Sequence, residues 1–181
     1  LSERNVPYRF IHTGQHEETM ADMYSDFNIK KPDLTLYSGG DITSVKKMFF
    51  WFFSLLYKTF TERKKIFHKD GKDIVLVHGD TFSTLLGALM GKMAGVHVGH
   101  VESGLRSRNL FHPFPEEITR LMVFRLSNTL FCPGSWAVAN VSRYKKEKIN
   151  TRGNTLVDTI RLSRALNKEK VNISGDPFAL V

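Results

Sequence analysis

The sequence predicts an α/β fold built on a doubly wound parallel sheet. Short apolar runs alternate with longer amphipathic segments along the 181 residues, as expected for strands separated by helices. The clearest unit is DIVLVHGDTFSTLLGALMGKMAG at 73–95, where a short apolar strand leads through a tight turn into a helix. Because parallel neighbours need a long crossover between them, this repeating order favours a parallel sheet with helices on both faces.

Six short apolar segments bounded by turn-forming residues are predicted as strands. They are Tyr8 to His12, Leu34 to Tyr37, Asp73 to His78, Val96 to Val101, Thr129 to Cys132 and Ile149 to Thr151. Six longer amphipathic segments are predicted as helices. They are Glu18 to Asn28, Thr43 to His68, Thr81 to Ala94, Pro115 to Leu126, Ser135 to Glu147 and Thr155 to Leu166. This order is typical of a Rossmann-like domain.

The composition favours a globular domain that does not bind nucleic acid. Hydrophobic residues make up 41% of the chain, and the net charge is +8. The basic residues fall in small clusters typical of solvated helix faces, and no nucleic-acid recognition motif accompanies them. A small anionic ligand remains compatible with this charge. The single cysteine, Cys132, has no partner for an internal disulfide and is predicted to be a buried, unreactive thiol.

The segment MFFWFFSLLY at 48–57 raises the question of a membrane contact. It is much shorter than the roughly 20 apolar residues that span a bilayer, and lysines close it at both ends. We therefore predict a helix packed within the domain and no stable membrane insertion, with a peripheral contact through the basic flanks as the alternative. The sequence shows no signal-peptide pattern, and a cytoplasmic location is expected.

Three acidic residues follow predicted strands or stand in loops rich in glycine and proline. They are Asp80 in HGDT, Glu102 in HVESGLRS and Glu116 in HPFPEE. Loops after parallel strands share one edge of the sheet, so these carboxylates could converge on a common pocket and divide acid and base catalysis between them. Structural roles are the alternative. Asp80 could cap the helix that follows it, and Glu116 could place favourable charge at a helix N-terminus.

Other polar residues at the same predicted edge are candidate substrate contacts. Gln15 and His16 follow the first predicted strand, where they either contact a ligand or stabilise the loop. His100 directly precedes Val101 and Glu102, and it either contacts a phosphate, orients a carboxylate or has a structural role.

Two arginines could contribute positive charge to the site. Arg106 in GLRS and Arg120 after PFPEE could hold an anionic substrate, or they could pair with Glu102 and Glu116. The sequence contains no Walker or GxGxxG pattern, and its histidines and cysteine lack the spacing of metal ligands. We therefore predict no metal and no cofactor.

Several of these segments together resemble the non-hydrolysing UDP-N-acetylglucosamine 2-epimerases. The resemblance is carried by VHGDTFSTLLGALMGKMAGVHVGHVESGLRSRNLFHPFPEEITR at 77–120, and by TGQHEETM, KPDLTLYSGG, FCPGSWAVANV and TRGNTLVDTI elsewhere. The pairing of HVE-x-GLRS with PFPEE at this separation is its most specific part. The sequence departs from the family pattern at Ser103, where alanine is commoner, and at Gly134, where threonine is commoner.

The resemblance implies the N-terminal domain of a two-domain fold of the glycosyltransferase-B type. Residues 1–170 would form a Rossmann-like domain that lacks the family's first strand, with its Gly-Thr-Arg-Pro turn. Residues 171–181 would begin a second Rossmann-like domain that is otherwise absent. We therefore expect the chain to be a fragment of a longer protein.

The activity implied by the resemblance is the reversible conversion of UDP-GlcNAc to UDP-ManNAc, by elimination of UDP to 2-acetamidoglucal and re-addition. Asp80, Glu102 and Glu116 match the family's catalytic carboxylates, and which of them removes the C2 proton stays open. The chain alone is expected to bind UDP poorly and to be inactive. The full-length protein is expected to be a homodimer with UDP-GlcNAc and UDP-ManNAc as its ligands.

Two other functions remain open on the sequence. One is a glycosyltransferase of the same architecture, against which HVE-x-GLRS and PFPEE both argue. The other is a catalytically silent nucleotide-sugar-binding or regulatory domain derived from the family. Tight binding of UDP-GlcNAc by the chain alone would favour the silent domain.

Overall fold

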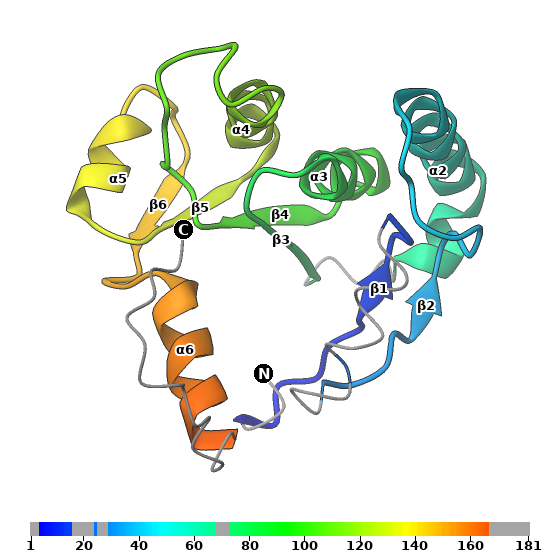
Figure 1. Cartoon of the computed structure of the whole chain (residues 1–181), viewed down its shortest axis with the longest axis horizontal. Helices are drawn as coiled ribbons and strands as arrows, with labels where there is room; N and C mark the ends of the chain where they lie inside the picture. The colour runs from blue at the N-terminus through cyan, green and yellow to red at the C-terminus, as the bar shows by residue number, and fades with distance from the viewer. Residues whose placement is uncertain (1–3, 16–23, 25–28, 68–72, 167–181) are drawn as a thin grey trace, which may run out of the picture.

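Parallel strands and crossover helices alternate through the chain (Figure 1). The computed structural model describes residues 4–15, 24, 29–67 and 73–166. A four-stranded parallel sheet has the order β3 (Ile74–His78), β4 (His97–Val101), β5 (Thr129–Cys132) and β6 (Glu147–Asn150). A separate two-stranded parallel sheet pairs β1 (Ile11–His12) with β2 (Leu34–Thr35). The predicted α/β fold with parallel strands is therefore confirmed.

In the part of the chain that the structure describes, four helices connect successive strands, and a fifth follows β6. They are α2 (Val45–Ile66), α3 (Phe82–Ala94), α4 (Glu116–Leu126), α5 (Ser135–Asn140) and α6 (Thr155–Leu166). In Figure 1, α2, α3, α4 and α5 follow one another around the outer side of the strands, whereas α6 lies on the opposite side. Crossovers of one hand produce this arrangement, because from β3 to β6 each one carries the chain a strand further in the same direction.

Most predicted elements form with small shifts of their ends, and one prediction is wrong. The helix predicted to run to Glu147 stops at Asn140, and β6 begins at Glu147 after a series of turns. Val141 and Tyr144 are buried in these turns, and Lys148 stabilises them by donating from Nζ to the Tyr144 carbonyl oxygen at 2.7 Å. The helix predicted at 18–28 lies outside the described residues apart from position 24.

The core consists of three adjoining clusters of buried side chains between the helices and the strands. The first joins α2, α3 and β2 and includes Trp51, Leu55 and Leu86. A second lies between α3, α4 and strands β3 and β4, and the third packs α4 and α5 against β5. Cys132 belongs to the third cluster and is buried, as predicted, and its burial raises the pKa of the thiol.

The aromatic segment forms α2, but only one side of this helix is packed in the domain. Trp51 and Leu55 are each 2% exposed, and the Trp51 indole donates to the Thr13 carbonyl oxygen at 2.9 Å. Phe50, by contrast, is 80% exposed. The prediction that this segment packs within the domain is therefore correct for one face only. Among the described residues, no helix is both long and apolar enough to cross a bilayer.

Candidate active site

The carboxyl ends of β3 and β4 lie level with each other. The register pairs His78, the last residue of β3, with Val101, the last residue of β4. Asp80 and Glu102 follow these strands by two residues and one residue, so both acids lie at the same edge of the sheet. The loop after β4 also leads from this edge to Glu116, the first residue of α4.

The turn after β3 presents Asp80 without using it as a helix cap. Gly79 has a φ of 74°, which favours glycine over residues with a side chain. Thr81 caps α3, because its side-chain oxygen accepts from the Thr84 N–H at 3.3 Å. The Asp80 carboxylate forms an ion pair with Arg120 instead. The capping alternative left open by the sequence is therefore wrong for Asp80.

Glu102 is held by residues from two other elements. Its backbone has a left-handed φ of 62°, which is uncommon outside glycine. The Thr155 hydroxyl, at the start of α6, donates to Glu102 Oε1 at 2.5 Å. His78 Nε2 lies 2.9 Å from the same hydroxyl oxygen and 3.6 Å from Glu102 Oε1. Because Thr155 uses its proton on the carboxylate, the His78 ring is the donor to Thr155.

Glu116 begins α4 directly behind Pro115. Its Oε2 atom is buried and has no hydrogen-bond partner among the described residues. Arg120 lies one turn further along the same side of the helix and pairs with Asp80. The loop after β3 is thereby attached to α4 one turn from Glu116. A buried carboxylate oxygen without a partner is a site that a substrate group could complete.

Both arginines pair with Glu117, a residue whose role the sequence alone did not indicate. Arg106 Nε forms an ion pair with Glu117 Oε1, and Arg120 lies 3.5 Å from Oε2. The backbone N–H of Ser107 donates to the same Oε2 at 3.1 Å. Of the two roles that the sequence left open for these arginines, the pairing with Glu102 and Glu116 is therefore wrong. The spacing of Glu117 and Arg120, three positions apart on a predicted helix, was the sequence signal that could have indicated their pairing.

Glu117 is a buried carboxylate that stays charged. Its side chain is completely inaccessible to solvent. Burial by itself would raise its pKa, but the hydrogen bonds from Arg106, Ser107 and Arg120 and the positive charge of Arg106 outweigh burial and lower the pKa. With Asp80 also bound to Arg120, the network joins the loops that follow β3 and β4.

His100 is a buried ring with both nitrogens in use. The residue is 1% exposed, Nε2 lies 2.7 Å from the Gly79 carbonyl oxygen, and Nδ1 lies 2.6 Å from the Ser103 hydroxyl. Burial lowers the pKa of His100 to about 4, so the ring is neutral at pH 7. Of the roles that the sequence left open, this geometry favours a structural one that fixes the turn at Gly79.

Gln15 ties the end of β1 to the start of α3. Its side-chain oxygen accepts from the Ser83 hydroxyl at 2.5 Å, and its backbone carbonyl accepts from the Ile42 N–H at 3.1 Å. These contacts are those of the loop-stabilising alternative, and the side chain remains partly exposed. His16, the other predicted contact in this loop, lies outside the described residues.

Comparison with known proteins identifies the family. Residues 1–181 match a family model described as UDP-N-acetylglucosamine 2-epimerase. The chain belongs to this family. A UDP-N-acetylglucosamine 2-epimerase from Methanococcus maripaludis is 37% identical over 171 residues, which cover 89% of this chain and 43% of the relative.

Other members of the epimerase family give the same picture. A UDP-2,3-diacetamido-2,3-dideoxy-D-glucuronate 2-epimerase from Pseudomonas aeruginosa is 33% identical over 169 residues, which cover 88% of this chain and 44% of the relative. The crystal structure of the Methanocaldococcus jannaschii UDP-GlcNAc 2-epimerase in complex with UDP-GlcNAc and UDP matches with a TM-score of 0.75 and 29% identity, over 95% of this chain and 46% of that one. The chain thus spans less than half the length of these relatives and has the fold of their N-terminal half.

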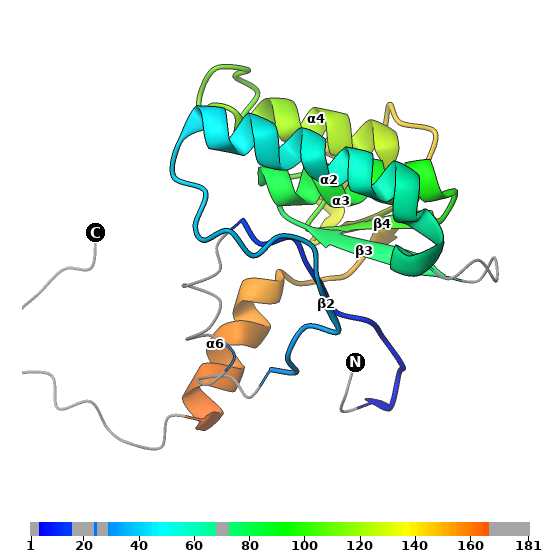
Figure 2. The ribbon, with the colours of Figure 1, turned by 90° about the vertical axis from the view of Figure 1, so that its right-hand side faces the viewer.

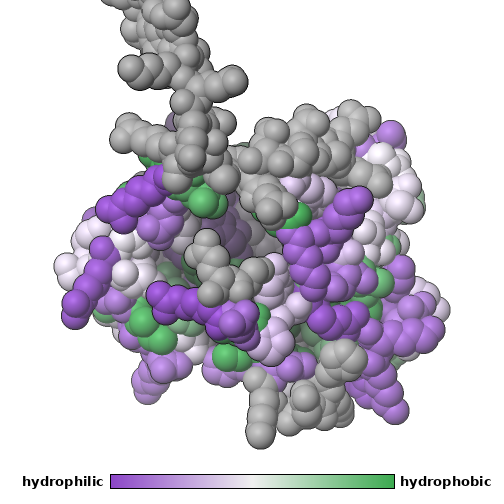
Figure 3. Space-filling view, turned by 90° about the horizontal axis from the view of Figure 1, so that it is seen from below, coloured by the Kyte–Doolittle hydropathy of each residue, from purple (hydrophilic) through white to green (hydrophobic). Residues whose placement is uncertain are grey.

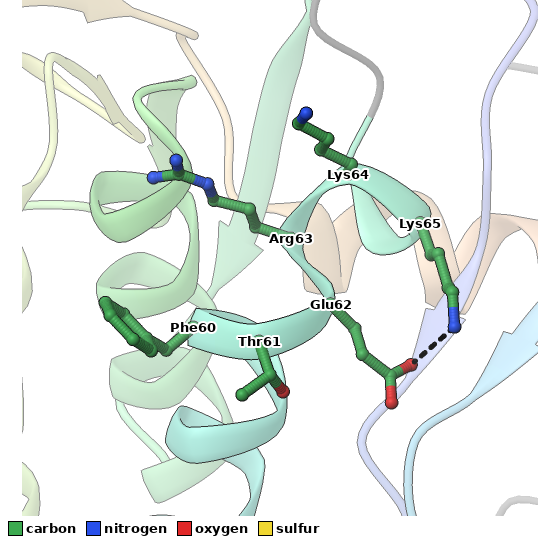
Figure 4. A pocket seen from close by; sticks show the side chains of 6 residues that line it. All are labelled: Phe60, Thr61, Glu62, Arg63, Lys64 and Lys65. Carbon is green, nitrogen blue, oxygen red and sulfur yellow. Dashed lines mark ion pairs between the residues drawn. The ribbon is translucent and has the colours of Figure 1, made fainter.

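A hollow of about 500 Å³ at the end of α2 is a separate feature of the chain (Figure 4). It is lined by Phe60, Thr61, Glu62, Arg63, Lys64 and Lys65. α2 ends at Ile66, shortly before β3 begins at Ile74, so the hollow lies toward the amino ends of the strands, whereas Asp80 and Glu102 follow their carboxyl ends. Among the described residues, no group of three or more histidines, cysteines and carboxylates could hold a metal ion.

Proposed function

We propose that this chain is the half of a UDP-GlcNAc 2-epimerase that carries the catalytic carboxylates Asp80, Glu102 and Glu116. The enzyme would interconvert UDP-GlcNAc and UDP-ManNAc. The observation that carries the proposal is the position of Asp80 and Glu102 at one sheet edge in a member of this family, with Asp80 attached through Arg120 to the helix that Glu116 begins. Such an arrangement can both remove and deliver protons.

The reaction requires a base for a weakly acidic carbon. One carboxylate would take the C2 proton, the C2–H electron pair would form the C1–C2 double bond, and UDP would leave with the electrons of the C1–O bond. A second carboxyl group would protonate the departing phosphate. Re-addition of UDP, with a proton delivered to the other face of C2, inverts that carbon. A positioned base contributes about 10² to 10⁴ in rate.

We also infer that the complete domain has another parallel strand beside β3. β3 is an edge strand of the four-stranded sheet, so the backbone groups along its outer side pair with no described strand, and the strand itself is apolar from Ile74 to Val77. Apolar edge strands of this kind are normally covered. Without that strand and a second domain the substrate would be held from one side only, so the chain alone would be inactive.

A chimera tests the proposed function. Residues of this chain replace the matching 43% of the Methanococcus maripaludis relative, and conversion of UDP-GlcNAc is followed by NMR. We expect the chimera to form UDP-ManNAc and the isolated chain to form none. Conversion by the parent relative controls for the assay. A folded chimera that converts no UDP-GlcNAc would contradict the proposal.

Two further arms separate the alternatives. The second substrate to test is UDP-2,3-diacetamido-2,3-dideoxy-D-glucuronate, which the name of the Pseudomonas aeruginosa relative suggests. Conversion of that sugar alone would reassign the substrate within the family. Calorimetry of the isolated chain with UDP-GlcNAc addresses the silent binding domain. Tight binding by the isolated chain, combined with an inert chimera, would favour that domain over an enzyme.

A further inference from the structure

Helix α2 presents a row of aromatic side chains to solvent. This aromatic row consists of Phe49, Phe50, Phe53, Tyr57 and Phe60, which are 56%, 80%, 60%, 72% and 70% exposed. Positions 49, 53, 57 and 60 follow at helical spacing, so they lie along one face of the helix. Phe49 and Phe53 stack with their ring centroids 6.2 Å apart. The row is thus one continuous apolar surface.

The aromatic row lies on the outermost element of its side of the molecule. Figure 2 shows α2 running across the front of the structure, with no described element in front of it. On the face seen from below, hydrophilic residues predominate and hydrophobic ones form small separate groups (Figure 3). Contiguous exposed apolar surface on a folded domain commonly marks an interaction site.

Basic residues close the aromatic row at both ends. Lys46 and Lys47 stand at its N-terminal end, and Arg63, Lys64 and Lys65 follow its C-terminal end. The backbone of Glu62 leaves helical geometry, with φ −116° and ψ 19°, and the three basic side chains after it spread apart (Figure 4). Residues 45–66 hold six lysines and arginines and the single acid Glu62, which already lies 3.9 Å from Lys65.

We propose that the aromatic row and its basic ends form a docking surface for an anionic lipid bilayer. Aromatic side chains favour the headgroup region of a membrane, and lysine side chains can extend from an apolar contact to reach lipid phosphates. Because the row runs along the helix, α2 would lie flat in the interface rather than cross it. This inference is independent of the proposed catalytic function.

A second copy of the chain fits this surface less well. In a two-fold dimer through α2 the aromatic row meets itself. A parallel pair places each basic end against its own counterpart, and an antiparallel pair places Lys46 and Lys47 against Arg63 to Lys65. Both arrangements bring like charges together, and α2 offers no unpaired acid to offset them. Anionic lipid supplies the missing opposite charge.

Vesicle sedimentation of the full 181-residue chain tests the proposal. Sucrose-loaded vesicles contain either phosphatidylcholine alone or phosphatidylcholine with about one-third phosphatidylglycerol. We expect binding to the anionic vesicles only, weakened roughly tenfold or more when salt rises from about 0.1 M to about 0.5 M. Equal binding to both vesicles, or binding to neither, would overturn the proposal.

Paired variants locate the contact. The double variant Phe50→Ser and Phe53→Ser should lower affinity for the anionic vesicles by roughly tenfold or more, and Lys46→Glu with Lys64→Glu should do the same by reversing charge. The matched controls are Phe111→Ser, at a residue 77% exposed elsewhere, and Lys31→Glu with Lys145→Glu at other exposed lysines. Equal losses in variants and controls would remove α2 from the contact.

Two measurements distinguish lipid contact through α2 from contact elsewhere and from self-association. An environment-sensitive dye is attached to Ser54→Cys, beside the aromatic row, in an otherwise unchanged chain. Its fluorescence emission should shift to shorter wavelength when anionic vesicles are added. No shift would count against contact through α2. Sedimentation equilibrium without lipid gives the oligomeric state. If the chain forms a dimer, and the double variant Phe50→Ser and Phe53→Ser is monomeric, the surface binds a second copy and the lipid proposal is overturned.

Discussion

The Ser103 hydroxyl donates to Nδ1 of His100 across 2.6 Å, in a place that solvent does not reach. His100 Nε2 in turn donates to the Gly79 carbonyl oxygen at 2.7 Å. The ring therefore joins the loop that holds Glu102 to the turn that presents Asp80. Ser103, one of the departures from the family pattern, satisfies a buried ring nitrogen in this chain.

The stability of the chain should fall as pH drops from 6.5 to about 4. Burial lowers the pKa of His100 from 6.5 to about 4, so in this window the unfolded state binds more protons than the folded state. The loss amounts to roughly 3 kcal/mol. Urea unfolding across this pH range measures it. His100→Gln keeps a donor toward Gly79 but does not titrate, so its stability should depend less on pH. An unchanged slope in His100→Gln would reject the assignment.

Glu117→Gln should destabilise the fold strongly. The substitution removes the carboxylate that pairs with the largely buried Arg106, whereas Arg120 keeps its ion pair with Asp80. We expect a loss of about 3 kcal/mol in the free energy of unfolding. The control is Glu62→Gln, which affects only an exposed pair with Lys65 and should cost less than about 0.5 kcal/mol. Equal effects of the two substitutions would show that the buried network contributes little.

Gly104→Ala should displace the loop that carries Glu102. Gly104 has a φ of 89°, and an added Cβ would lie 2.3 Å from the Ala137 carbonyl oxygen. Gly95→Ala is the matched control, because Gly95 has a φ of 73° with open space around it. We expect roughly 1 kcal/mol of destabilisation at Gly95 from backbone strain alone, and about 3 kcal/mol or more at Gly104. Thermal unfolding of both variants decides whether the close approach matters.

The sequence predicted the position of the site better than its contacts. Asp80 and Glu102 could be assigned to one sheet edge, because the carboxyl ends of parallel strands always share an edge. The contact between Thr155 and Glu102 could not be predicted from the sequence, because it joins residues 53 positions apart and depends on where α6 begins in space. Glu116 and Glu117 are adjacent and chemically identical, and only the burial of Glu117 between two arginines distinguishes their roles.

Hydrophobic periodicity is misleading where two structures share one pattern. Val138, Val141 and Tyr144 have helical spacing, so the segment after Ser135 resembles a long helix in sequence. In the structure Val141 and Tyr144 are buried from turns instead. A hydrophobic pattern records which side chains are buried, and it does not record the backbone path that buries them.

Exchange of the C2 proton with solvent tests the central claim that Asp80, Glu102 and Glu116 carry the chemistry. In deuterated water, the chimera with the Methanococcus maripaludis relative should incorporate deuterium at C2 of the nucleotide sugar, as NMR would show. Glu102→Gln should reduce incorporation by about 10² or more, whereas Glu147→Gln, at an exposed residue of β6, should leave it unchanged. Undiminished exchange in Glu102→Gln would contradict the account.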